Sequence, residues 1–139
     1  MKYLCLVYHE EACIDALPDS EYNAIIDEVL EYREELRVSG HFIAASPLQS
    51  VLTATTIRVR NGRLTLTDGP FAETKEVVGG FALLQANSKE EAIELVKTFL
   101  KVAGDGECEL RQLYEPTDYE GEFVPERTDA DLRAQWESP

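Results

Sequence analysis

The sequence predicts a single domain of the α+β class, in which two helices cover one antiparallel sheet. Three observations support this prediction. Two segments carry an apolar stripe at helical spacing, and several shorter segments are rich in apolar and β-branched residues. The chain of 139 residues, 44% of them hydrophobic, is long enough for one core. We predict that the domain spans residues 1–115.

The first half of the domain is predicted to be a strand, a loop and a helix. Residues 2–8 are apolar and aromatic, as in a buried strand, and residues 9–18 are expected to form a loop. Asp19 or Ser20 can cap the helix that follows, and Gly40 is a suitable left-handed stop. The helical stripe consists of Tyr22, Ile25, Ile26, Val29, Leu30, Arg33 and Leu36.

The middle of the chain is predicted to be a short strand followed by a β-hairpin. Residues 41–45 form the strand, and residues 46–49 turn the chain. Residues 54–60 alternate in polarity as a half-buried strand does, and residues 63–67 form the returning strand. Asn61-Gly62 between them is a type I′ turn signal, because both residue types accept positive φ.

Two strands and a second helix complete the domain. Residues 77–86 and 108–114 are the strands, and Ser88 with Glu91 forms a capping box at the helix start. Ala92, Ile93, Val96, Phe99, Leu100 and Ala103 make the apolar face, and Gly104 to Gly106 ends the helix. Without the hairpin the order is βαββαβ, the ferredoxin-like arrangement. The sheet face opposite the helices then needs a cover, which predicts a face-to-face dimer unless the C-terminal tail covers it.

The charge excludes some partners. The net charge of −14 disfavours DNA, RNA and anionic membranes. No apolar run approaches the roughly 20 residues that cross a bilayer, and the N-terminus is too short for a signal-peptide core, so we expect a cytoplasmic protein. The chain lacks nucleotide-binding, metalloprotease and serine-hydrolase motifs, and its scattered carboxylates specify no metal, so we predict neither cofactor nor metal.

Residues 116–139 are predicted to be an acidic tail that begins at Pro116. One interpretation is a solvated segment that aids solubility. The other is an arm that docks on a partner subunit through Phe123, Val124, Leu132 and Trp136.

The cysteines and histidines are expected to have structural roles. Three cysteines without CxxC spacing argue against disulfides and zinc. Cys5 and Cys108 lie in apolar segments and are expected in the core, whereas Cys13 lies in the predicted loop. His9 and His41 are expected to be exposed or to cap an element, although His9 beside two acids could shuttle protons.

The segment Asp68-Gly69-Pro70-Phe71-Ala72-Glu73-Thr74-Lys75-Glu76, here called the signature loop, is the candidate site. Asp68 can accept backbone N–H bonds in an Asx turn, or it can act with Glu73 as an acid or base if repulsion raises a carboxylate pKa. Lys75 can hold an anionic group or pair with an acid. The candidate catalytic residues are Asp68, Glu73 and Lys75, and the candidate ligand-binding residues are Gly69, Pro70, Phe71, Glu76, Gly79, Gly80 and Phe81.

Each of the ligand-binding candidates has a competing structural role. Phe71 and Phe81 can wall an apolar pocket or pack in the core. Gly79-Gly80 can let backbone amides approach a ligand or can form a bulge.

The chain resembles the DGPF branch of the YCII-related family over residues 1–115. The segments that carry this resemblance are Met1-Lys2-Tyr3, Pro47-Leu48-Gln49, residues 54–60, Asn61-Gly62, Thr67 with the signature loop, Val78-Gly79-Gly80-Phe81 and Glu109-Leu110-Arg111. The resemblance implies a bacterial protein and a dimeric α+β barrel of ferredoxin-like subunits. Relatives are often encoded beside sigma factors.

The chain departs from the YCII pattern at two places. The first helix has no histidine, and Phe99-Leu100-Lys101-Val102 replaces the Asp-Pro expected after the second helix. The His–Asp pair of that branch therefore cannot be transferred to this chain.

The sequence leaves three functional hypotheses open, so whether the protein is an enzyme stays undecided. The first is a small-molecule site beside the signature loop with acid–base chemistry. The second is a non-catalytic ligand-binding or regulatory module associated with sigma-factor-dependent transcription. The third is a dimerisation domain in which the loop is an interface element.

Overall fold

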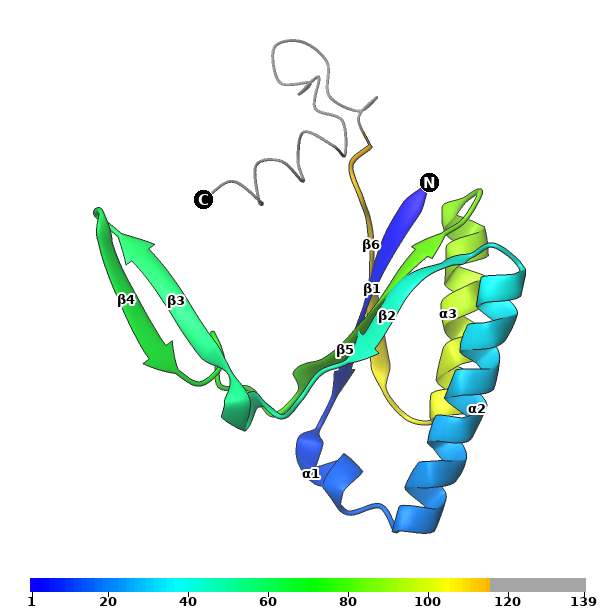
Figure 1. Cartoon of the computed structure of the whole chain (residues 1–139), viewed down its shortest axis with the longest axis horizontal. Coiled ribbons are helices and arrows are strands. Elements are labelled where there is room, and N and C mark those ends of the chain that lie inside the picture. The colour runs from blue at the N-terminus through cyan, green and yellow to red at the C-terminus, as the bar shows by residue number, and fades with distance from the viewer. Residues whose placement is uncertain (116–139) are drawn as a thin grey trace, which may run out of the picture.

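The computed structural model describes residues 1–115, and the predicted tail at 116–139 lies outside the described residues. A four-stranded antiparallel sheet in the order β2-β5-β1-β6 forms the body, with α2 and α3 on one face (Figure 1). Two further strands form a separate sheet. The elements are β1 (Lys2–His9), α1 (Glu11–Asp15), α2 (Asp19–Val38), β2 (Phe42–Pro47), the 3₁₀ turn η1 (Val51–Thr53), β3 (Thr55–Arg60), β4 (Arg63–Asp68), β5 (Val77–Gln85), α3 (Lys89–Ala103) and β6 (Glu107–Gln112).

The core lies between the sheet and the two long helices. Strand side chains alternate between faces, so Cys5 of β1 and Leu84 of β5 point toward the helices and are buried. Val96 of α3 and Tyr32 of α2 pack against them. The Tyr32 hydroxyl donates a 2.7 Å hydrogen bond to the Leu95 carbonyl oxygen, which joins the two helices.

The first long helix differs from its prediction at two points. α2 begins at Asp19, and Pro18 precedes it without a side-chain cap, so the predicted cap is wrong. The buried residues are Tyr32 and Leu36, whereas the predicted stripe residues Tyr22 and Leu30 are exposed. An α-helix has 3.6 residues per turn, so an apolar-rich segment offers more than one row of apolar side chains. The row that the rest of the protein covers can therefore differ from the predicted stripe.

The ends of both helices confirm several local predictions. The Ser88 hydroxyl accepts a 3.1 Å bond from the Glu91 amide, and the Glu91 carboxylate accepts from the Asn87 amide at 3.3 Å. Gly40 and Gly104 follow α2 and α3 with φ of +82° and +92°. This left-handed region favours glycine, as predicted for the helix stops.

The sheet face opposite the helices carries apolar side chains that no described helix covers. Leu4 pairs with Leu83 and Leu6 with Phe81, and residues directly opposite share a face. They alternate with Tyr3 and Cys5, which are buried on the helical side. We call these four residues, together with Tyr8 next along β1, the uncovered sheet face.

Strands β3 and β4 form a hairpin, here called the arm, that projects from the body (Figure 1). Asn61 and Gly62 have φ of +52° and +74°, so both residues adopt the positive φ predicted for the turn. The prediction of a half-buried strand is wrong for the apolar face, because Ile57 and Leu66 are 64% and 67% exposed. Within residues 1–115 the arm pairs only with itself.

The remaining differences concern short elements. Residues 9–18, expected as a loop, contain helix α1. β2 extends to Pro47, at a sheet edge where a missing amide is tolerated, so the predicted turn begins later. The turn η1 at the base of the arm was not predicted. No helix in the described part of the chain is long and apolar enough to span a membrane.

Candidate functional site

The signature loop begins where the arm returns to the body. The Gly69 amide donates to the Ala54 carbonyl oxygen at 2.8 Å, and the Thr56 hydroxyl donates to the Gly69 carbonyl oxygen at 2.8 Å. Gly69 has a φ of +109°, which other residues rarely adopt. Among the described residues the Asp68 carboxylate accepts no hydrogen bond, so the expected Asx turn is not formed. Backbone bonds fix the loop, and this carboxylate stays available.

A hollow of about 410 Å³ lies on the arm side of the signature loop. Its lining residues are Val51, Leu52, Asp68, Gly69, Pro70, Glu73, Thr74 and Val77. We call it the arm-side hollow. Its walls are apolar except for two carboxylates and one hydroxyl, and neither carboxylate has an ion-pair partner within residues 1–115. Small-molecule sites also combine apolar walls with a few polar groups, but this hollow is open to solvent, since Leu52 is 91% exposed.

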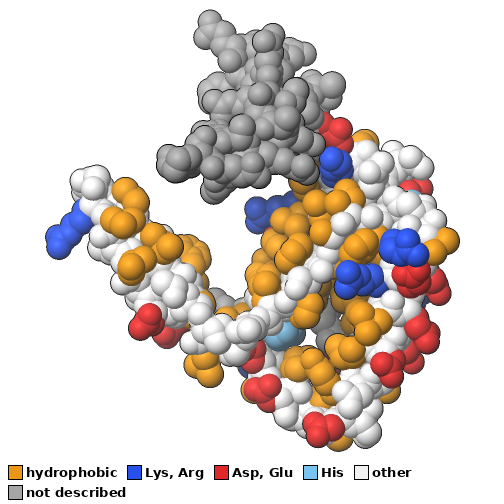
Figure 2. Space-filling model, in the orientation of Figure 1, with side chains coloured by type: hydrophobic (Ala, Val, Ile, Leu, Met, Phe, Trp, Pro, Cys, Tyr) orange, Lys and Arg blue, Asp and Glu red, His pale blue; other side chains and the backbone are white. Residues whose placement is uncertain are grey.

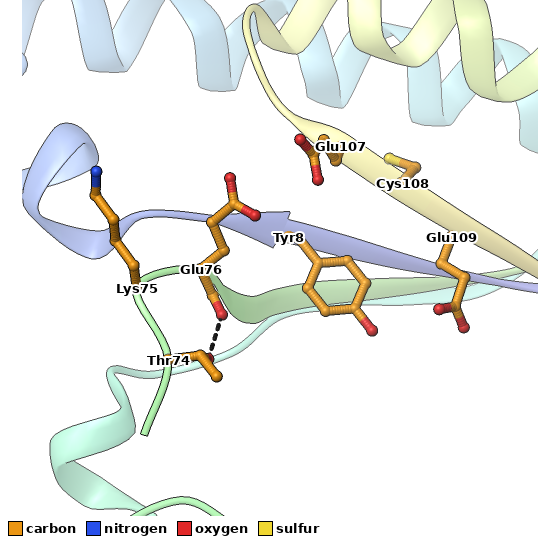
Figure 3. A pocket seen from close by; sticks show the side chains of 7 residues that line it. All are labelled: Tyr8, Thr74, Lys75, Glu76, Glu107, Cys108 and Glu109. Atoms are coloured by element: carbon orange, nitrogen blue, oxygen red, sulfur yellow. Dashed lines mark hydrogen bonds between the residues drawn. The ribbon is translucent and has the colours of Figure 1, made fainter. Parts of the chain in front are cut away.

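A second hollow, of about 710 Å³, lies on the other side of the loop (Figure 3). Its lining residues are Tyr8, Thr74, Lys75, Glu76, Glu107, Cys108 and Glu109. We call it the sheet-side hollow. Tyr8 and Glu109 point to the side of the sheet away from the helices (Figure 3). Three carboxylates against one ammonium make this hollow acidic.

The structure separates the predicted catalytic residues. Asp68 and Glu73 share the arm-side hollow, whereas Lys75 and Glu76 line the sheet-side hollow. The Lys75 side chain is 81% exposed and lies 3.3 Å from a Glu10 carboxylate oxygen, so it is an exposed ion pair. Thr74 lines both hollows, and the loop forms the wall between them.

The predicted aromatic and glycine ligands are also divided. Gly69 and Pro70 line the arm-side hollow. Phe71 is 81% exposed and lines neither of the two hollows, so it does not wall a pocket within the described chain. Phe81 lies in the sheet opposite Leu6.

The Gly79-Gly80 pair forms the predicted bulge in β5. The pairing with β1 shifts between Val7 and Tyr8. A Cβ at Gly79 would lie 1.8 Å from a carbon of the His9 ring, so the glycine makes room for that ring. A Cβ at Gly80 would lie 3.2 Å from the Ser46 carbonyl oxygen. Both glycines therefore serve close packing, and His9 is half-buried rather than exposed.

Residues 8–11 connect all parts of the candidate site. Tyr8 lines the sheet-side hollow, His9 packs on Gly79, and Glu10 pairs with Lys75 of the signature loop. Glu11 accepts bonds from the Val51 amide at 2.8 Å and the Ser50 hydroxyl at 2.9 Å. These two bonds lower the pKa of Glu11, chiefly through the Val51 amide. The segment 9–18, predicted as a loop, thus begins with residues that contact β5, the signature loop and η1, and we call these residues anchors.

Sequence reasoning noted His9 beside two acids but assigned no partner to residues 8–11, and it did not place Glu107 and Glu109 at the site. Four consecutive polar or aromatic side chains at the end of a strand are an ambiguous signal by themselves. The pairing of β1 with both β5 and β6 brings them to the site, since Tyr8 lies opposite Glu107 and His9 opposite Val77. Knowing that β1 is central would have identified them.

Cys5 and Cys108 lie in or against the core, as predicted, whereas Cys13 lies in helix α1 rather than in a loop. Cys5 is buried, Cys108 packs against the core and Cys13 is exposed, and all three are free. Interaction with the Cys108 thiol, together with burial, raises the pKa of Cys5, and the interaction with Cys5 lowers the pKa of Cys108. Within residues 1–115 no three histidine, cysteine or acidic side chains are placed to hold a metal ion.

Comparison with known proteins assigns the chain to a family. The model of the YCII-related domain matches residues 1–115. An uncharacterised protein of Rhizobium meliloti (strain 1021) is 29% identical over 119 residues, which are 84% of this chain and 96% of that protein. A solved structure of 5-chloro-2-hydroxyhydroquinone dehydrochlorinase from Burkholderia phenoliruptrix AC1100, in complex with 2,5-dihydroxybenzoquinone, is 16% identical. It covers 86% of this chain and 100% of its own, with a TM-score of 0.46, a likeness too weak to bear on activity. The family match over residues 1–115 places the chain among the YCII-related domain proteins.

Proposed function

We propose that the protein binds a small organic molecule in the arm-side hollow. The observation that carries this proposal is the pair Asp68 and Glu73, two carboxylates without ion-pair partners in residues 1–115 that line one hollow with apolar walls. Such a site suits a ligand with an apolar body and a hydroxyl or amine donor. Val51 and Leu52 would contact the apolar body, and the carboxylates would accept its hydrogen bonds.

The same arrangement supports acid–base chemistry as the finer form of the proposal. A carboxylate beside a bound hydroxyl or activated C–H can remove its proton, and a second carboxyl group that carries a proton of its own can donate that proton to another atom of the compound. Asp68 is the last residue of β4, and the next residue, Gly69, is held by bonds to the Ala54 carbonyl oxygen and the Thr56 hydroxyl, so we assign Asp68 the role of base. Glu73 would be the partner acid. This assignment leaves out Lys75, because it lines the other hollow.

We also propose that the chain pairs with itself through the uncovered sheet face, in a dimeric α+β barrel of ferredoxin-like subunits. Leu4, Leu6, Phe81 and Leu83 support this proposal, because a sheet with one bare apolar face gains by burying it against a copy of itself. The resemblance of the signature loop to the DGPF branch points the same way.

A thermal-shift screen tests the binding proposal. The panel holds small aromatic and aliphatic compounds with hydroxyl or amine groups, tested on wild type, Asp68→Asn and Glu73→Gln. Glu76→Gln is the matched control, because it removes the same charge from the other side of the loop. A compound that raises the Tm of wild type and the control but not of the two variants supports the site by mass action on the folded state. Equal responses in all four proteins would move the site elsewhere.

Deuterium exchange into the compound, followed by NMR, separates an enzyme from a binding module. Exchange that depends on Asp68 supports acid–base chemistry. Binding to wild type without exchange would favour the regulatory module associated with transcription.

A further inference from the structure

The arm exposes one complete apolar face. In the register of the arm Ile57 lies opposite Leu66 and Val59 opposite Leu64, so the four side chains share one face. They are 64%, 67%, 66% and 63% exposed. An isolated two-stranded hairpin is marginally stable in water, and it needs a further strand or a packing partner. The arm therefore needs a cover that the described chain does not supply.

The arm also differs from the rest of the chain in charge. Residues 55–67 contain Arg58, Arg60 and Arg63 and no acid, so all 27 acidic residues of the chain lie elsewhere. Arg60 and Arg63 form the last pair before the turn, at the tip. The arm is a basic and apolar element on a strongly acidic protein, which favours an acidic partner surface.

The body offers a surface with the complementary properties. The uncovered sheet face supplies the apolar side chains Leu4, Leu6, Phe81 and Leu83. At one border of this face lies the sheet-side hollow with Glu76, Glu107 and Glu109. Figure 2 shows hydrophobic side chains on the arm and on the part of the body across from it. The apolar face of the arm can lie on this strip. Arg60 and Arg63 leave the opposite face of the arm, but they stand at its tip, where their long side chains can reach the acids around the end of the hairpin.

The dimensions of the two surfaces agree. A strand of six residues is about 20 Å long, and four strands about 4.8 Å apart span roughly 14 Å. The arm is long enough to cross a whole sheet. Its connection to the body places it away from its own sheet (Figure 1), so a sheet of another molecule is the surface that it can meet.

We propose that the arm of each copy docks on a second copy at the end of the uncovered sheet face beside Tyr8, with Arg60 and Arg63 at the acidic sheet-side hollow, while the rest of that face packs on the sheet of the first copy. The proposal rests on the self-association proposed above and adds the arm as its clamp. The signature loop then separates a ligand hollow within one copy from a hollow that receives the arm of the other. Glu109 is already paired with Arg111 of its own strand, which leaves Glu76 and Glu107 as the principal acidic contacts.

A charge-swap experiment tests this docking. One variant carries Arg60→Glu and Arg63→Glu, and the other carries Glu76→Arg and Glu107→Arg. Sedimentation equilibrium should show that the dimer dissociation constant of each variant alone rises by about 100-fold, because like charges then meet. An equimolar mixture should form a heterodimer close to wild-type affinity, since each arm then meets an opposite charge.

Two controls address folding and the choice of occupant. Lys89→Glu with Lys101→Glu on α3 makes the same change of charge away from the arm, and it should leave the dissociation constant unchanged. A chain that ends after Glu115 should dimerise as wild type does; loss of its dimer would assign the sheet face to the tail and overturn the proposal. Circular dichroism of each variant checks that the body is folded.

The outcomes separate the two proposals about self-association. A wild type that is monomeric at every concentration overturns both the dimer and the docked arm. A dimeric wild type whose Arg60 and Arg63 variant keeps its affinity overturns the docked arm alone. Restored affinity in the mixture, with neither variant dimeric by itself, establishes that the arm of one copy meets the hollow of the other.

Discussion

The sheet of the body and the arm share one sequence pattern, but its apolar side chains are buried in the body and exposed in the arm. In β1 the alternation buries Tyr3 and Cys5 to 1% and 2% exposure against the helices. In the arm an equally regular alternation leaves Ile57 and Leu66 more than half exposed. Alternation therefore predicts that a strand has an apolar face, but it does not say which part of which molecule covers that face.

The largest test of this comparison is a matched pair of leucine truncations. Leu84→Ala in β5 removes side-chain atoms from a residue that is 3% exposed, so the free energy of unfolding should fall by about 2–5 kcal/mol. Leu66→Ala in the arm should change it by less than about 0.5 kcal/mol in dilute monomer. Chemical denaturation at low protein concentration measures both values. Equal losses would mean that the arm packs on its own body.

A second prediction concerns the point where the body meets the loop. Gly79→Ala places a methyl group where the His9 ring lies, and the ring must move, so we expect a loss of about 1–3 kcal/mol. His9→Ala should remove most of that loss in the double variant, because the space is then free. A double-mutant cycle on the free energy of unfolding gives the coupling.

The control for this cycle is Gly80→Ala, whose added methyl group meets the Ser46 backbone rather than a side chain. The loss of unfolding free energy caused by Gly80→Ala should be the same with and without the His9 side chain. A Gly79→Ala loss that His9→Ala leaves unchanged would assign the glycine to backbone conformation alone.

The elements fixed by local signals were predictable. The capping box at Ser88, the glycine stops after both helices and the Asn61-Gly62 turn depend on residues near in sequence, and each has the expected geometry. The buried residues of α2 were less predictable, because Tyr32 is buried through its contacts with α3. Such contacts are not encoded in the spacing of one helix.

For the candidate site, the sequence pointed to the loop but not to how its side chains are divided. The loop at 68–76 does border hollows, but its charged residues divide between two of them. That division follows from the strand order, which brings Glu107 of β6 opposite Tyr8 and so builds the second hollow. Glu10 and Glu11 were likewise unassigned, because their partners Lys75 and Val51 are distant in sequence.

A third prediction tests how the arm is fastened to the body. The bonds from Val51 and Ser50 lower the pKa of Glu11 below its ordinary value of 4.5. A lowered pKa means that the carboxylate stabilises the folded junction above the unfolded pKa, and that this contribution is lost as the pH falls through the folded pKa. The Val51 amide proton shift in NMR should therefore move at a pH below 4.5 in wild type.

Glu11→Gln should make the Val51 shift independent of pH in that range. Glu28→Gln, an exposed acid on α2, is the matched control and should leave the titration unchanged. A Val51 shift that titrates with the same midpoint after Glu11→Gln would assign the effect to another acid. Glu11 would then not be what holds the base of the arm.

The smallest expected effect concerns Cys13, which reports on the other anchor, Glu10. The Cys13 thiol lies 3.5 Å from a Glu10 carboxylate oxygen, and this hydrogen bond and the negative charge raise its pKa above the ordinary value. Glu10→Gln should lower that pKa and speed alkylation of Cys13 by iodoacetamide at pH 8 by a few-fold, because the thiolate is the nucleophile. Mass spectrometry of the Cys13 peptide measures the rate, with Glu94→Gln on α3 as the control.

An unchanged rate would mean that Glu10 does not face Cys13, and its pairing with Lys75 would need the same revision. A faster rate would show that Glu10 lies between α1 and the signature loop, so that the loop is held from the body side as the arm is held by Glu11.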